Sequence, residues 1–218
     1  MIYKLDIRIK GHRNLDDVEE FMRTNKTKII FFAETHGILS ELKIQEKIIA
    51  KLKPICYVYE LLEEEKIISE KDFKKFLSMP NSKRFSVISS YGELKPTVML
   101  AKKYYLPLIG CDIKNMCRKN RNFLNKINID EEKRIMLKRE RKQARVIKES
   151  LIQYGPPIFV SVGAFHLRKN SLIFQKIKAK SIIVYPLIDK KRLYDLPEDF
   201  DIRKAKNIRY IIEDNNGK

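Results

Sequence analysis

The chain has 218 residues, of which 44% are hydrophobic and 34% are charged, and its formal net charge is +18. This length and composition exclude a disordered chain and favour one globular domain. No apolar run reaches the roughly 18 residues of a membrane-spanning helix, and residues 1–10 lack the apolar centre of a secretory signal, so we expect a cytoplasmic protein.

Strands and helices are predicted to alternate along the chain. Strands are expected at 2–10, 28–33, 55–59, 106–111, 158–162 and 181–185. Helices are expected around 18–22, after a cap at Asn14 or Asp16, and at 42–52, 73–77, 94–105 and from near 130 to before 155. This alternation is typical of right-handed β-α-β units. The sequence therefore predicts a single three-layer α/β/α domain over residues 1–218, with a mostly parallel central sheet.

For two further segments the sequence predicts a role but no definite secondary structure. Residues 78–93 are a candidate exposed loop or lid over a functional site, and Tyr91 within it is a candidate ligand-binding residue. The tail 189–218 is polar apart from a short apolar patch at 209–212. This patch is a candidate edge strand, and the tail is otherwise an extension of the domain.

Several of the predicted strands run directly into a polar residue. Glu34 and His36 follow the strand at 28–33, and Glu60 follows the strand at 55–59. Asp112 and His166 stand after later strands in the same way. Because the carboxyl ends of parallel strands lie along one edge, and ligands bind in the crevice outside it, we expect these side chains to converge on one site.

The histidines at this edge indicate acid–base or metal chemistry. The chain contains three histidines, and both His36 and His166 fall at predicted strand ends. Imidazole acts as an acid, a base or a metal ligand near neutral pH. Two histidines and one carboxylate match the protein ligands of a catalytic metal with an open position, so His36, Glu60 and His166 are candidate ligands of a divalent ion such as manganese, cobalt or zinc. The alternatives are structural histidines and, above all for Asp112, a helix-capping role.

The long predicted helix carries a carboxylate on its apolar face. At about 100° per residue, Glu140 falls among the apolar side chains, and Arg141 lies at the border of that face. A carboxylate so placed is costly unless a positive group meets it. Glu140 and Arg141 are therefore candidates for supporting the site or binding an anion. Alternatively, Arg141 belongs to the solvated basic face of the helix.

The net charge of +18 favours polyanionic partners such as nucleic acid, anionic lipid or phosphorylated molecules. Basic residues are densest between Lys114 and Lys148, but without the alternation of aromatic and basic residues that stacks bases. A general abundance of lysine produces the same net charge without such a partner. Nucleic-acid binding is therefore a less favoured alternative.

Short motifs at these positions resemble those of a known family. Residues 33–37 (AETHG) resemble the first motif of the erythromycin esterase family, Gly-Glu followed closely by His-Gly, although Ala33 stands in place of the first glycine. The motifs at 58–60 (VYE), 139–144 (RERKQA) and 163–166 (GAFH) resemble those of the wider superfamily. This superfamily also includes the haem-binding lipoprotein ChaN, the TraB proteins and the Tiki metalloproteases. Order and approximate spacing agree over residues 28–168.

The resemblance implies an α/β/α fold and one of several activities: ester hydrolysis around a catalytic histidine, metal-dependent peptide hydrolysis, or haem binding without catalysis. We predict a hydrolase of an ester or amide bond in a small-molecule or peptide substrate. Its candidate catalytic residues are Glu34, His36, Glu60, Arg141 and His166, and its candidate ligand-binding residues are Tyr91, Asp112 and Glu140. The alternatives are a non-catalytic protein that binds a small ligand or haem, and a polyanion-binding basic protein.

Overall fold

A computed structural model of the chain describes residues 15–35, 41–79, 94–114, 129–168, 170–187 and 208–213. The expected strand at 2–10, His36 and Tyr91 lie outside these ranges, as does most of the expected loop at 78–93. The described ranges contain the other strands and helices that the sequence predicts.

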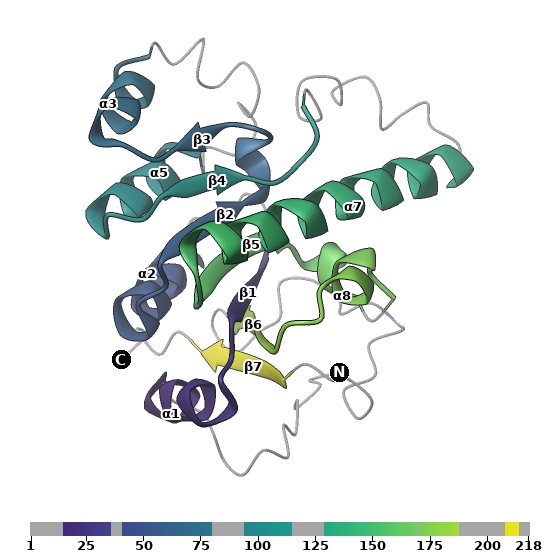
Figure 1. The fold of residues 1–218 in the computed structure, drawn as a ribbon, viewed down its shortest axis with the longest axis horizontal. Coiled ribbons are helices and arrows are strands. Elements are labelled where there is room, and N and C mark those ends of the chain that lie inside the picture. Colours follow the sequence, from purple (N-terminus) through teal and green to yellow (C-terminus); the bar gives the residue numbers. More distant parts are fainter. Residues whose placement is uncertain are drawn as a thin grey trace.

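A seven-stranded sheet in the order β3-β4-β2-β5-β1-β6-β7 lies at the centre of the described residues (Figure 1). Its strands are β1 (Ile29–Glu34), β2 (Cys56–Tyr59), β3 (Lys66–Ile67), β4 (Leu108–Gly110), β5 (Ile158–Gly163), β6 (Ser181–Leu187) and β7 (Ile208–Glu213). All neighbours pair in parallel except β3 and β4. The mostly parallel sheet is confirmed, and so is the edge strand expected at 209–212, which is β7.

Helices cover both faces of this sheet (Figure 1). They are α1 (Leu15–Asn25), α2 (Glu41–Leu52), α3 (Glu70–Ser78), α5 (Leu94–Lys103), α7 (Ile129–Tyr154) and α8 (Leu172–Lys176), with the short 3-10 helices η1 (Glu60–Leu62) and η2 (Ala164–Leu167). The helices α1, α2, α3 and α5 share one apolar core with the sheet, whereas α7 and α8 share the other. This arrangement confirms the predicted three layers.

The strands supply both cores because successive side chains in a strand point to opposite faces. Ile30 and Phe32 of β1 pack in the core beneath α1 and α2. Ile29 and Phe31 pack in the core beneath α7. All four side chains are fully buried. A central strand covered on both faces is therefore apolar along its whole length, which is the pattern that predicted it.

The ends of two helices differ from the predicted positions. α5 ends at Lys103 because Tyr105 adopts a positive φ of 55°, and the N–H of Leu106 bonds to the carbonyl of Ala101 at 2.9 Å. This is the Schellman end of a helix. Asp16 lies within the first turn of α1 and is not its cap. β3 and α8 were not predicted, because elements so short carry little periodicity.

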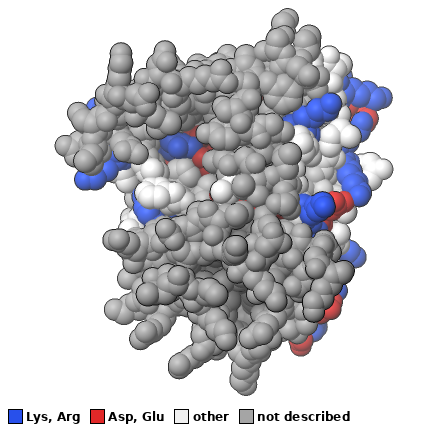
Figure 2. Space-filling view, turned by 180° about the vertical axis from the view of Figure 1, so that it is seen from behind, with Lys and Arg blue, Asp and Glu red and all other residues white. Residues whose placement is uncertain are grey.

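The described surface carries charges of both signs. Figure 2 shows lysine and arginine side chains next to acidic ones along one border of the molecule. Lys51 of α2 pairs with Asp16 of α1, and Lys103 pairs with Glu46 at 2.6 Å. Exposed pairs of this kind contribute little to stability. No helix in the described ranges has the length and apolarity needed to cross a membrane.

Gly110 allows a close backbone contact that brings two strand ends together. A Cβ atom on Gly110 would lie 2.4 Å from the carbonyl oxygen of Glu63, in the turn that follows η1. The N–H of Asp112 donates to that same oxygen at 3.0 Å. The turn after β2 thus rests directly on the end of β4, and Glu60 and Asp112 are brought to the same end of the sheet.

Substitution of Gly110 by alanine should lower the free energy of unfolding by about 3 kcal/mol, because the added carbon meets backbone atoms that cannot move aside freely. Urea denaturation measures the change. Gly155→Ala is the matched control, since no neighbouring group among the described residues lies within 4 Å of its added carbon, and the positive φ of 84° opposes it. We expect about 1 kcal/mol there. Equal losses for the two variants would contradict this explanation.

Candidate functional site

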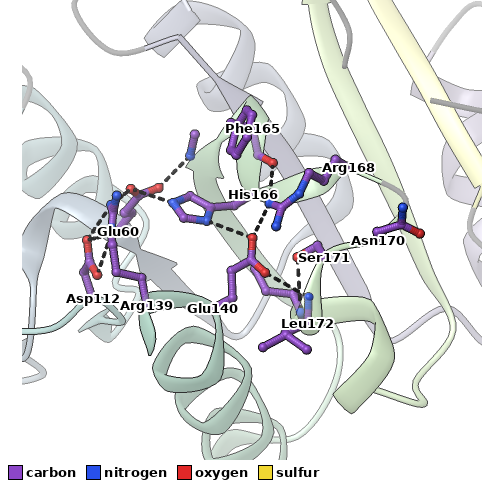
Figure 3. Close-up of polar contacts among 12 residues, drawn as sticks. Glu60, Asp112, Arg139, Glu140, Phe165, His166, Arg168, Asn170, Ser171 and Leu172 are labelled. Atoms are coloured by element: carbon purple, nitrogen blue, oxygen red, sulfur yellow. Dashed lines mark hydrogen bonds and ion pairs between the residues drawn. The ribbon is translucent and has the colours of Figure 1, made fainter. Parts of the chain in front are cut away.

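A continuous polar network lies at the carboxyl end of the sheet (Figure 3). Negative and positive groups alternate along it in the order Asp112, Arg139, Glu60, His166, Glu140 and Arg168. They come from the residues after β2 and β4, from α7, and from η2 and the residue after it. Glu60, Asp112, Glu140 and His166 are at most 4% exposed. Charges buried to this extent are stable only when they are paired.

Glu60 lies at the centre of the network and joins three parts of the fold. Its Oε1 accepts a hydrogen bond from Arg139 of α7 and lies 3.4 Å from Nε2 of His166. Its Oε2 accepts from the backbone N–H of Gly163, at the end of β5, at 2.6 Å. Since Glu60 itself follows β2, one carboxylate holds the ends of two strands and the covering helix together.

Arg139 binds two carboxylates at once. Its Nε lies 3.1 Å from Oδ1 of Asp112 and its Nη2 lies 2.7 Å from Oδ2, so this pair is bidentate. The same Nη2 donates to Glu60. Burial raises the pKa of the Asp112 carboxyl above its ordinary value, although the charge of Arg139 acts in the opposite direction. The guanidinium thus compensates two acidic groups that would otherwise repel each other.

His166 lies between two carboxylates. Its Nε2 is 3.4 Å from Oε1 of Glu60, and its Nδ1 is 3.5 Å from Oε1 of Glu140. Burial alone lowers the pKa of His166, but the two carboxylates outweigh it, and the net shift is upward. An imidazole with an acceptor at each nitrogen is best matched in its protonated form, which has a donor on both.

Glu140 is completely buried on the face of α7 that meets the sheet. Its Oε1 accepts from Arg168, and its Oε2 accepts from the N–H of Leu172 at 2.9 Å. Burial opposes ionisation of Glu140, but the bonds from His166, Leu172 and Arg168 hold its pKa below the ordinary value. The expected positive partners of this carboxylate are therefore confirmed, and they are Arg168 and His166.

Glu34, the last residue of β1, belongs to a second polar group on the opposite face of the sheet. Its Oε1 accepts from the hydroxyl of Tyr59 at 3.2 Å, and its Oε2 accepts from the hydroxyl of Ser161. Glu34 also pairs in register with Gly163, whose N–H binds Glu60. The two polar groups thus meet at adjacent strand ends, on either side of the carboxyl edge of the sheet.

The structure places most of the expected site residues at this edge. Glu60, Asp112, Glu140 and His166 form one network, and Glu34 lies one strand away. Arg141 is exposed, and its neighbour Arg139 makes the contacts to the carboxylates. His36 and Tyr91 lie outside the described residues, so the meeting of His36 with His166 stays a prediction. Arg168, Ser161 and Tyr59 were not anticipated, because hydroxyls on strands and a single arginine carry no local signal.

The donor set around Glu60 and His166 does not fit a metal ion. Both oxygens of Glu60 accept from protein donors, and the guanidinium of Arg139 stands where a cation would bridge Glu60 and Asp112. Within the described ranges, no group of histidine, cysteine and acidic side chains could hold a metal. His166 does not fit as an axial haem ligand either, because each of its nitrogens faces a carboxylate.

Removal of Arg139 should destabilise the fold far more than removal of its neighbour on the same helix. Arg139→Ala leaves Glu60 and Asp112 buried without their shared cation, which should lower the free energy of unfolding by about 3–5 kcal/mol. Arg141→Ala, the matched control at an exposed position, should change it by less than about 0.5 kcal/mol. Denaturant titration of both variants tests this, and a similar effect of the two substitutions would exclude the proposed pairing.

Stability should also depend on pH through His166. Its pKa is raised in the folded state, so its stabilising charge is fully present below the unfolded value of 6.5 and is lost as pH rises through the folded pKa. We expect the urea midpoint of the native protein to fall with rising pH above 6.5 relative to that of His166→Gln. Glu140, whose pKa is lowered from 4.5, loses its contribution only in acid and does not interfere. Parallel pH profiles of the two proteins would refute the assignment.

Comparison with known proteins shows similarity in structure only. No known protein-family profile matches the chain, and no curated protein matches it in sequence. The type III effector HopBA1 has a similar structure, with a TM-score of 0.51, 17% identity, and coverage of 86% of this chain and 88% of that chain. ChaN of Campylobacter jejuni, described with cofacially bound haem, has a TM-score of 0.48 and 13% identity over 84% of this chain and 88% of its own. The likeness to HopBA1 concerns the α/β fold, and the resemblance of the motifs to the erythromycin esterase family stays a prediction.

Proposed function

We propose that this chain is a hydrolase of ester or amide bonds that uses the network at the carboxyl edge of the sheet. The observation that carries the proposal is the buried imidazole of His166, with one carboxylate at each nitrogen. Such a network costs stability, and perturbed titratable groups gather where chemistry requires them. The position at the carboxyl edge, where α/β sheets bind ligands, supports the same conclusion.

Two side chains supply the proton-transfer groups of the proposed reaction. His166, held as an imidazolium by Glu60 and Glu140, serves as the general acid. Glu34 accepts hydroxyl hydrogen bonds on both oxygens and serves as the general base. An acid and a base at neighbouring strand ends are the two groups that hydrolysis of an ester or amide requires.

The proposed reaction uses water as the nucleophile. Water attacks the carbonyl carbon while Glu34 takes its proton, and the bond to the leaving oxygen or nitrogen breaks as His166 donates a proton to that atom. Glu34 then loses its proton to solvent and His166 regains one. The thiols of Cys56 and Cys111 are poor nucleophiles, since burial raises the pKa of Cys56 to about 12 and that of Cys111 above its ordinary value.

Binding of a small ligand without catalysis is the second candidate function. The observation that favours it is that both nitrogens of His166 face carboxylates of the protein, so neither N–H is directed at a bound molecule. In this case the network would only line the binding site and hold its charged groups in fixed positions. The two candidates differ in whether the bound molecule is converted.

An assay with p-nitrophenyl esters and p-nitroanilides tests the proposal. Replacement of His166 or Glu34 by glutamine should lower kcat/KM by about 10²-fold to 10⁴-fold, because each variant lacks one proton-transfer group. Lys138→Ala, an exposed position on α7, is the control and should keep the native rate. Circular dichroism establishes that each variant is folded. Absence of turnover on every substrate, or native rates in both glutamine variants, would exclude the hydrolase.

A further inference from the structure

Phe165, which is exposed, and Arg168, which is partly buried, form a pair on either side of His166 in the chain (Figure 3). The side chain of Phe165 is 54% exposed, and the guanidinium carbon of Arg168 lies 4.8 Å from the centre of its ring. Nη1 of Arg168 also donates to the carbonyl oxygen of Phe165 at 3.1 Å. The aromatic ring and the cation are therefore fixed relative to each other, at the surface beside the buried network.

Glu140 holds Arg168 by one nitrogen only. Nη1 makes both of its hydrogen bonds, to Glu140 and to the carbonyl of Phe165. Among the described residues, Nε and Nη2 of Arg168 have no partner. The side chain of Arg168 is 16% exposed. These two nitrogens form the forked edge of a guanidinium, which matches the two oxygens of a carboxylate or a phosphate.

We propose that Phe165 and Arg168 recognise an aromatic or similarly flat apolar group that carries a carboxylate or phosphate. The ring of Phe165 supplies the apolar surface and the free edge of Arg168 binds the oxyanion. We further infer that such a group is part of the substrate. This second statement rests on the proposed function, whereas the recognition itself does not.

The pair is connected directly to the proposed reaction centre. Oε1 of Glu140 is shared between Nη1 of Arg168 and Nδ1 of His166, at 3.5 Å from the latter. The carboxylate of Glu140 therefore connects an anion-binding Arg168 to His166, the proposed general acid. A substrate anchored in this way is held in position for the reaction, which is the main contribution that binding makes to catalysis.

Binding measurements test the recognition without requiring turnover. The probes are benzoate, phenyl phosphate and the neutral benzamide, titrated at constant ionic strength by isothermal calorimetry. The native protein should bind benzoate or phenyl phosphate at least about tenfold more tightly than benzamide, because a charge-assisted pair is lost with the neutral amide. Whichever acid binds more tightly identifies the oxyanion.

Two variants assign this preference to the pair. Arg168→Lys keeps the charge but removes the fork, and it should weaken binding of the preferred acid about tenfold. Phe165→Leu keeps an apolar side chain but removes the ring, and it should weaken binding about threefold to fivefold. Arg145→Lys and Ile152→Ala, at exposed positions of α7, are the matched controls. Phe165→Leu remains informative if Arg168→Lys does not fold, because the ring of Phe165 is largely exposed.

The outcomes separate this inference from the proposed function. Equal binding of the acids and benzamide, or native affinity in both Phe165→Leu and Arg168→Lys, overturns the recognition site. Selective binding that these variants weaken, together with no turnover of any ester or amide, keeps the recognition site and rejects the hydrolase. Turnover without any preference for anionic aromatic groups rejects the inference and keeps the hydrolase.

Discussion

The buried carboxylate of Glu60 is the contact on which the rest of the site depends. It follows β2, accepts from the backbone of Gly163 at the end of β5, accepts from Arg139 of α7, and faces His166. A carboxylate this deeply buried requires donors on both oxygens. Those donors come from separate parts of the chain, so this one side chain links α7, the end of β2 and the end of β5.

The alternation of charges explains how three carboxylates can be buried close together. Asp112, Glu60 and Glu140 are each separated from the next by a guanidinium or an imidazole, so no two of them meet without a cation between. Well-packed apolar residues of similar volume would be at least as stable as buried ion pairs in many proteins. Stability alone therefore does not explain why charged residues occupy these positions, which supports the proposed role of the network in chemistry.

Local pattern identified the strands and the long helix, because a strand buried on both faces and a helix with one apolar face each impose a period that can be read without contacts. The same pattern could not distinguish Arg139 from Arg141. Both stand next to Glu140 and are rotated from it by the same angle in opposite directions along α7. Only the side on which β2 and β4 approach the helix decides that Arg139 reaches Glu60 and Asp112, and that Arg141 faces solvent.

The parallel sheet, its layers and the polar residues at its strand ends thus follow from the order of residues along the chain. The protonation and pairing of those residues do not, because they depend on distances between groups far apart in sequence. The upward shift in the pKa of His166, the anchoring of Glu140 by Arg168, and the mismatch between Glu60 and a metal ion arise when β2, β5, η2 and α7 are packed together. Electrostatic interactions fall with distance and rise with burial, and neither quantity is encoded in local sequence.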